Sequence, residues 1–225
     1  MNRWYLLERA LAPGNGEELR LYKRGEEFAI RVGKGELMNS RMHGSEEALA
    51  ELACRRVTGR PRPRVLIGGL GMGFTLAKAL HVLGAEAQLV VAELVPAVVV
   101  WNRGLLGGLA GNPLQDSRVT VREVDVATIM LAEKRAYDAI LLDIDNGPDG
   151  LTRKGNDWLY GLNGLKVAHS ALRTGGVLTV WSAAPDQQFS NRLQKAGFTV
   201  DEVRVRARGA RGGARHTIWI AYRIA

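Results

Sequence analysis

The feature that most restricts the fold is a series of short strands rich in Val, Ile and Leu that alternate with helical segments from residue 64 onward. Strands that are apolar throughout are buried on both faces, which is typical of a parallel sheet with helices on each side. One of the helical segments begins at Pro96, a residue that suits the first position of a helix. The predicted strands are 64–68, 87–94, 118–124, 137–144 and 176–182.

The C-terminal part departs from this alternation. Residues 198–208 and 216–224 have strand patterns, and the Gly/Arg loop between them is too short for a helix, so they predict an antiparallel hairpin. At the other end, residues 1–44 alternate apolar and polar positions around tight turns, as a small β-meander does. The predicted fold class is α/β: a Rossmann-like, mostly parallel seven-stranded sheet with a C-terminal antiparallel hairpin, plus the N-terminal meander.

A boundary between two parts of the chain is expected near residue 60. Ser45, followed by two glutamates, has the sequence of a helix N-cap. The helical pattern that follows it ends at "TGRPRPR", because each proline biases the preceding residue away from helix. We therefore predict a small region of strands and one helix over residues 1–60, and a nucleoside-binding catalytic domain over residues 61–225.

Composition and charge exclude several classes of protein. The net charge of +8 is concentrated in segments 55–64 and 204–215, which lack interleaved aromatic residues, so a basic linker and a basic loop are favoured over a nucleic-acid interface. The single cysteine, Cys54, and the lack of an apolar stretch as long as a membrane span predict a cytoplasmic protein with no membrane partner. The scattered histidines predict no metal site.

The segment "RVLIGGLGMGFTLAKAL", residues 64–80, joins a strand to a helix through closely spaced glycines. Such a loop presents backbone N–H groups and a helix N-terminus to a nucleotide. A dinucleotide fingerprint requires glycines at positions one, three and six, and counting from Gly69 the sixth position is Phe74. Gly69, Gly71 and Gly73 instead form G-x-G-x-G, the spacing of sites for S-adenosylmethionine (SAM).

Three carboxylates follow the next predicted strands at positions that suit such a ligand. Glu93 ends the second strand, where it can accept both ribose hydroxyls. Asp125 follows the third strand, near the expected adenine amine, and Asp143 ends the fourth, across the switch point from the glycine loop. Each carboxylate alone could simply be solvated or cap the next helix. Together they predict a site for an adenosyl sulfonium nucleoside.

The segment "YDAILLDIDNGPDG", residues 137–150, places further acidic residues at the mouth of the same crevice. In a basic protein, a local acidic cluster indicates that the accepted group is an amine or another cation. We predict that Asp143 is the base or orienting group, and that Asp145, Asn146 and Asp149 hold the acceptor. The alternative is an Asx turn that caps the following helix.

The chain resembles the spermidine synthase family, the polyamine aminopropyltransferases of the class I SAM-dependent methyltransferase superfamily. The resemblance covers nearly the whole chain and rests on "VLIGGLGMG", "VVAEL", "REVDV", "YDAILLDIDNGP" and "LRTGGVLTV". It implies that Asp143 matches the first aspartate of the family's D-x-x-D-P motif, which assists deprotonation of the attacking amine. The second aspartate falls on Asn146, with Asp145 beside it, so the acceptor contacts are only partly preserved.

The same resemblance implies further pocket residues and a donor. The family places Tyr, His or Glu residues before its first long helix, and "RMHGSEE" is similar, which makes His43, Glu46 and Glu47 candidates for substrate binding. Relatives with this fold commonly form dimers, so a homodimer is a further expectation. The donor implied is decarboxylated SAM, used as a co-substrate, and no metal is implied.

Met72 departs from the family pattern. The family's glycine loop reads G-G-G-D-G, and its aspartate receives the amino group of decarboxylated SAM; Met72 stands at that place. An acid there would repel the carboxylate of SAM itself, because two like charges about 4 Å apart cost several kcal/mol at an effective dielectric constant near 20. Without that acid, SAM becomes an admissible donor, and methyl transfer becomes a rival to aminopropyl transfer.

Residues 151–161, "LTRKGNDWLYG", form a long polar and aromatic connection that suggests a lid. Trp158 and Tyr160 could wall the acceptor pocket, and the alternative is that both pack in the core. Two other functions stay open at this point: methylation of a nucleic acid or another substrate, with the Arg/Gly loop as the contact, and a non-catalytic SAM-binding module.

Overall fold

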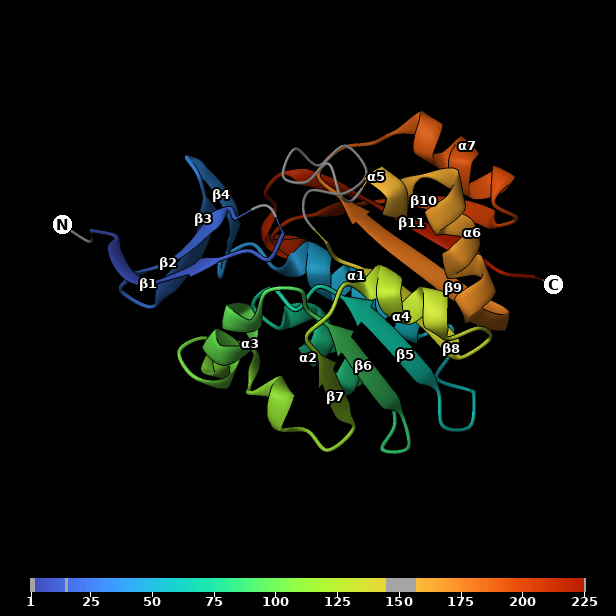
Figure 1. The fold of residues 1–225 in the computed structure, drawn as a ribbon, viewed down its shortest axis with the longest axis horizontal. Helices are drawn as coiled ribbons and strands as arrows, with labels where there is room; N and C mark the ends of the chain where they lie inside the picture. The colour runs from blue at the N-terminus through green and yellow to red at the C-terminus, as the bar shows by residue number, and fades with distance from the viewer. Residues whose placement is uncertain (1–2, 15, 145–156, 225) are drawn as a thin grey trace.

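The computed structural model describes the chain apart from residues 1–2, 15, 145–156 and 225. Two sheets make up the molecule, a four-stranded sheet and a seven-stranded one, and Figure 1 shows the smaller sheet projecting from the side of the larger body. Within the described parts of the chain, no helix has the length and apolar character needed to cross a membrane.

The N-terminal residues form the predicted meander as an antiparallel sheet in the order β1-β2-β3-β4. Its tight turns lie at Gly25 and Gly33, which have φ values of 60° and 56°. These left-handed values favour glycine, since other residues meet a steric cost there. The strands are β1 (Tyr5–Leu11), β2 (Glu18–Arg24), β3 (Glu27–Val32) and β4 (Gly35–Asn39).

The larger sheet has the strand order β10-β11-β9-β8-β5-β6-β7. β5 to β9 pair in parallel, and the hairpin of β10 and β11 adds to β9 antiparallel. The predicted Rossmann-like fold class is therefore confirmed. The strands are β5 (Arg64–Gly68), β6 (Gln88–Ala92), β7 (Val119–Arg122), β8 (Tyr137–Leu142), β9 (Leu172–Ser182), β10 (Thr199–Arg206) and β11 (Arg215–Tyr222).

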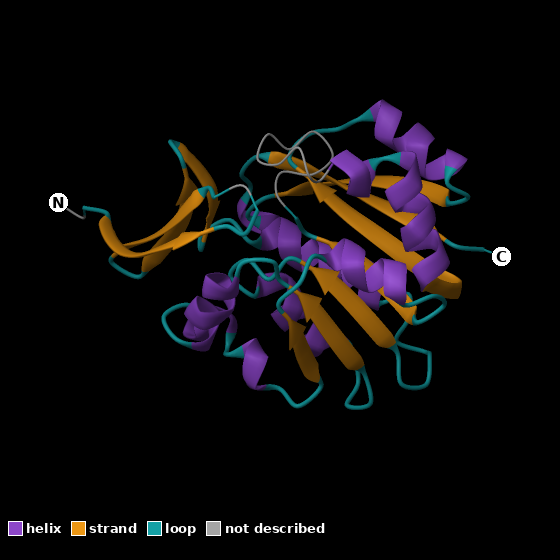
Figure 2. Cartoon of the chain, in the orientation of Figure 1, coloured by secondary structure: helices purple, strands orange, loops and turns teal. Residues whose placement is uncertain are grey.

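Helices cover both faces of this sheet, as Figure 2 shows, and each face has its own apolar cluster. Residues of α1, α2 and α3 join one cluster, and residues of α4, α6 and α7 join the other. The α-helices are α1 (Gly44–Cys54), α2 (Phe74–Val82), α3 (Pro96–Arg103), α4 (Val126–Ala132), α5 (Asp157–Tyr160), α6 (Leu162–Ala171) and α7 (Gln187–Lys195), with short 3-10 turns at Gly107–Ala110, Pro113–Gln115 and Gly209–Arg211.

The start of α1 corrects the predicted capping residue. His43 occupies the N-cap position, and Ser45 lies inside the first turn with its Oγ bonded to Glu46 Oε2. α1 packs against α2 and the larger sheet, although the predicted division placed it with residues 1–60. That division stays a prediction.

The basic segment before β5 has a structural partner. Asp138, buried in β8, accepts hydrogen bonds from Nη1 of Arg60 at 2.7 Å and from Nη1 of Arg173 at 2.8 Å. The backbone N–H of Arg64 also donates to Asp138, at Oδ2, over 2.8 Å. Part of the positive charge in segment 55–64 therefore neutralises the buried carboxylate of Asp138.

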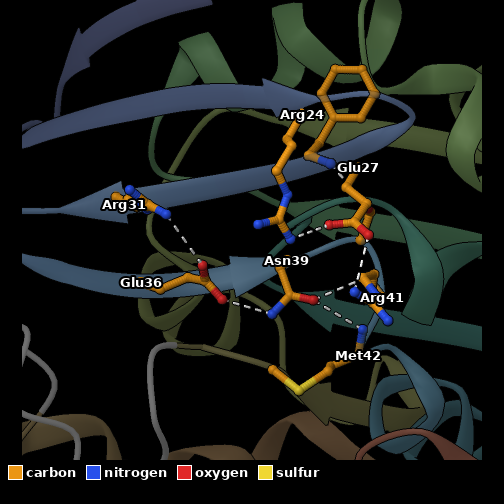
Figure 3. A network of polar contacts seen from close by, with 9 residues as sticks. Arg24, Glu27, Arg31, Glu36, Asn39, Arg41 and Met42 are labelled. Carbon is orange, nitrogen blue, oxygen red and sulfur yellow. Dashed lines mark hydrogen bonds and ion pairs between the residues drawn. The ribbon is translucent and has the colours of Figure 1, made fainter. Parts of the chain in front are cut away.

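A polar network fixes the turn that leads from β4 into α1 (Figure 3). Asn39 Oδ1 accepts from the backbone N–H groups of Arg41 and Met42, at 3.0 and 3.1 Å. Arg41 in turn pairs with Glu27 at 3.0 Å, and Arg24 holds the second oxygen of Glu27 at 2.7 Å. The network ties the small sheet to the residues that begin α1.

Candidate functional site

A cavity lies between the small sheet and the carboxyl edge of β5, β6, β7 and β8. Its volume is about 900 Å³, counted with the space at its open mouth. The small sheet contributes apolar side chains to its wall, among them Leu19 and Ile30. From the larger sheet, the cavity is lined by predicted site residues: Gly69, Gly71, Glu93, Asp125 and Asp143.

The glycines of the loop are required by the backbone itself. Gly69, Gly71 and Gly73 have φ values of 89°, 54° and 85°, which other residues rarely adopt. A Cβ at Gly69 would collide with the carbonyl oxygen of Asp143, and one at Gly73 would lie 3.1 Å from Oδ1 of Asn102. The loop therefore holds the end of β5 close to the end of β8, and Gly69 and Gly71 leave their side of the cavity open.

Met72 does not face this cavity. Its side chain is 3% exposed and belongs to the apolar cluster beneath the loop. The position that carries an acid in the family pattern thus holds a buried, uncharged thioether. Of the loop residues 69–73, Leu70, Met72 and Gly73 lie outside the cavity lining.

Glu93 is a buried carboxylate held by the backbone on both sides. Oε2 accepts from the N–H of Leu70 at 2.9 Å, and Oε1 accepts from the N–H of Val95 at 2.8 Å. These bonds fasten the glycine loop to the end of β6. Glu93 also lines the cavity.

Asp125 is exposed and serves as the N-cap of α4. Its Oδ1 accepts from the N–H of Ala127 at 2.8 Å. It also lines the cavity, so the capping role and a contact with a ligand are compatible.

Asp143 lines the cavity and lies near enough to Glu46 for its charge to act on that second carboxyl group. Oδ2 of Asp143 accepts from Oγ1 of Thr75 at 2.6 Å. Burial raises the pKa of Asp143 to about 6, against the opposing effect of the Thr75 hydroxyl. Burial first, and the Asp143 carboxylate second, raise the pKa of Glu46 to about 8. The two carboxyl groups therefore hold a proton at higher pH than ordinary carboxyl groups do, which is typical of acid–base sites.

Three residues near this pair were missed by the sequence analysis. Thr75 lies two residues after the glycine loop. Its position could therefore have indicated a contact with Asp143, at the end of the fourth predicted strand. Ser45 hydrogen-bonds Glu46, and Nδ1 of His216 lies 2.9 Å from Ser45 Oγ. No local pattern could have found this second contact, because the two residues are 171 positions apart.

His43 lies in a different hollow from the main cavity. Nδ1 of His43 is 2.9 Å from Oε1 of Glu47, and the imidazole stacks on Phe74 with the ring centroids 4.2 Å apart. These residues line a separate hollow together with Lys78. A role of His43 in substrate binding stays a prediction.

The aromatic residues of the predicted lid have different surroundings. Tyr160 is buried, donates to the carbonyl oxygen of Ile144 at 3.1 Å and meets Phe189 edge to face. Trp158 is 40% exposed. Tyr160 thus fits the core-packing alternative. The predicted acceptor residues Asp145, Asn146 and Asp149, and most of the predicted lid, lie outside the described residues.

The solved structures that resemble this chain include spermidine synthases. The crystal structure of spermidine synthase from Thermotoga maritima has a TM-score of 0.77 at 14% identity, over 99% of this chain and 81% of that chain. Spermidine synthase in complex with the transition state analogue AdoDATO has a TM-score of 0.75 at 14% identity, over the same fractions of 99% and 81%. The chain has the spermidine synthase fold.

A third structure, a probable spermidine synthase from Corynebacterium glutamicum ATCC 13032, has a TM-score of 0.63 at 14% identity, over 97% of this chain and 79% of that chain. No family model matches the sequence, and no curated protein matches it. The spermidine synthase fold accounts for both the small N-terminal sheet and the seven-stranded sheet. The resemblance predicted from the motifs is confirmed at the level of the fold.

Proposed function

We propose that this protein binds an adenosyl sulfonium nucleoside and transfers an alkyl group from it to a small amine. The observation that carries the proposal is the meeting of Glu93, Asp125 and Asp143 around one cavity, beside the glycine loop. Buried Glu93 would accept the ribose hydroxyls, and Asp125 the adenine amine. The apolar wall from the small sheet suits the faces of the nucleoside.

The transfer is an in-line displacement at a carbon of the sulfonium, which already contains a good leaving group. The protein must position donor and acceptor and supply a neutral amine. A free amine with a pKa near 10 is protonated at neutral pH. Asp143, ionised because its pKa is about 6, would take one proton from the bound ammonium group. The amine nitrogen then attacks the sulfonium carbon as the carbon–sulfur bond breaks.

Met72 leaves the choice of donor open between decarboxylated SAM and SAM. The fold neighbours named above are spermidine synthases, one with the analogue AdoDATO, which favours aminopropyl transfer from the decarboxylated donor. The buried thioether of Met72 adds no charge that would repel the carboxylate of SAM, which favours methyl transfer. Both reactions use the same site and the same base.

Product analysis distinguishes these reactions. The protein is incubated with each donor and a panel of diamines, and the nucleoside products are identified by mass spectrometry. Methylthioadenosine indicates aminopropyl transfer, and S-adenosylhomocysteine indicates methyl transfer. If the protein bound either donor yet released neither product with any amine, a non-catalytic binding module would replace the proposed activity.

A further inference from the structure

The first turn of α1 is fastened to the C-terminal hairpin. The backbone N–H of Gly44 donates to the carbonyl oxygen of Ala207 at 2.8 Å. A Cβ at Gly44 would collide with the backbone nitrogen of Gly209, so this close approach requires glycine. The contact brings Ser45 beside His216, the second residue of β11, and it gives the Arg/Gly loop a structural role.

Ser45 connects His216 to Glu46 through two hydrogen bonds. Ser45 Oγ donates to Oε2 of Glu46 at 3.0 Å, and Nδ1 of His216 lies 2.9 Å from the same Oγ. A serine hydroxyl has one proton to donate. When Ser45 donates to an ionised Glu46, Nδ1 of His216 must therefore carry a proton and donate to Ser45. When Glu46 is protonated, both bonds reverse, and Nδ1 accepts.

The surroundings of these groups suit such a reversal. Ser45 is fully buried, whereas His216 is partly exposed and packs edge to face on Trp181, with 4.7 Å between ring centroids. Burial lowers the pKa of His216, so its imidazole is neutral at pH 7 and has one nitrogen free to accept. The ionisable groups acting on Glu46 are Asp143, after β8, and Glu47, on its own helix.

We propose that Glu46, Ser45 and His216 form a proton relay that carries the proton of the acceptor amine from the cavity to the partly exposed end of β11. The relay rests on the proposed transfer to an amine. Asp143 takes one N–H proton from the ammonium group. The Glu46 proton then moves to Ser45 Oγ, the Ser45 proton moves to Nδ1 of His216, and Nε2 releases a proton to water. This leaves Glu46 ionised and His216 neutral, with its proton on Nδ1. Glu46 then takes the proton from Asp143, which restores the ionised base.

One prediction of the relay can be tested without measuring enzymatic activity. In the protein labelled with ¹⁵N-histidine, NMR should show His216 changing from the Nε2–H to the Nδ1–H tautomer as the pH rises through about 8, where Glu46 ionises. E46Q should hold one tautomer across this range, and D143N should move the midpoint to lower pH because a negative neighbour is lost. H216Q identifies the signal, and exposed His81 serves as the control. A His216 tautomer that is constant from pH 6 to 9 in the wild type would overturn the relay.

Kinetics then tests the relay in turnover. H216Q and S45A should each lower kcat about tenfold with little change in the KM for the amine, and S45T, which keeps the hydroxyl, should restore kcat. The wild-type pH profile of kcat should change shape in H216Q. Identical profiles in H216Q and wild type would contradict the relay. If the wild type released no product with any amine, the proposed function would fail, while the NMR titration would still decide whether the three groups exchange protons.

Discussion

Asp138 and Asp143 belong to the same strand and its end, yet they have opposite surroundings. Asp138, at the amino end of β8, is 2% exposed and is held by two guanidinium groups and a backbone N–H. Asp143, at the carboxyl end, has one hydroxyl donor, Thr75, and its charge raises the pKa of a second carboxyl group, Glu46. Among the described residues, no cation pairs with Asp143.

The difference separates a structural carboxylate from the one that we propose as the base. A buried charge with matched counter-charges is stable as an ion, and removing it leaves its partners uncompensated. Burial raises the proton affinity of Asp143, and the charge of Asp143 in turn raises the proton affinity of Glu46. Of the two acidic residues, Asp143 is the one that lines the cavity.

The largest expected effect is on turnover. Asp143→Asn should lower kcat about 1,000-fold, because the base that deprotonates the amine is lost, and should leave the Kd for the donor nearly unchanged. Its melting temperature should stay the same or rise, since Thr75 can still donate to the amide oxygen. Steady-state kinetics and calorimetry measure the two effects, and full activity in this variant would exclude Asp143 as the base.

Asp138→Asn should show the reverse pattern. We expect it to cost about 3 kcal/mol of folding free energy, because Arg60 and Arg173 lose their shared counter-charge. For a chain of this size this corresponds to a fall in melting temperature of roughly 10 °C. Asp201→Asn, at an exposed carboxylate, is the matched control. A loss below about 1 kcal/mol in Asp138→Asn would remove the contrast between the two ends of β8.

Binding of the donor should depend on Glu93 more than on Asp125. Glu93→Gln should weaken the binding of a nucleoside about 30-fold, because a charged acceptor of the ribose hydroxyls is lost. Asp125→Asn should weaken it about fivefold while keeping the helix cap, since asparagine caps as well as aspartate does. Isothermal titration with methylthioadenosine measures the affinity of each variant. Equal affinities in the wild type and both variants would place the ligand outside this cavity.

The last prediction concerns the dependence of stability on pH. The pKa of Glu46 is raised from 4.5 to about 8, so the folded protein holds a proton that the unfolded chain releases as the pH rises from about 4.5 to 8. Stability from this group is present below pH 4.5 and is lost through that window. Melting curves should show the melting temperature of the wild type falling relative to that of Glu46→Gln as the pH rises from 5 to 8. A constant difference would mean that Glu46 has an ordinary pKa.

Features that depend on local pattern could be predicted from the sequence. Apolar runs such as residues 137–142 indicate strands buried on both faces, and a parallel topology then brings Glu93 and Asp143 to one edge. Contacts between distant segments could not be predicted in this way. His216 reaches Ser45 only because a hairpin adds to the sheet beside α1, and Arg60 reaches Asp138 only when β5 and β8 are neighbours.

The direction of a side chain in a loop could not be predicted from the sequence either. The motif identifies the position of Met72 but not that its side chain turns into the core rather than toward the cavity. Helix starts were equally difficult to predict: Ser45 has the chemistry of an N-cap, but α1 begins at Gly44 and His43 takes the N-cap position.

The most direct measurement is calorimetric titration of the wild type and Glu93→Gln with methylthioadenosine, decarboxylated SAM and SAM. The account predicts that all three compounds bind the wild type at one site, that Glu93→Gln weakens every one of them, and that SAM binds at least as well as its decarboxylated form. Absence of heat with all three compounds would contradict the nucleoside site, and a strong preference for the decarboxylated donor would contradict the inference from Met72.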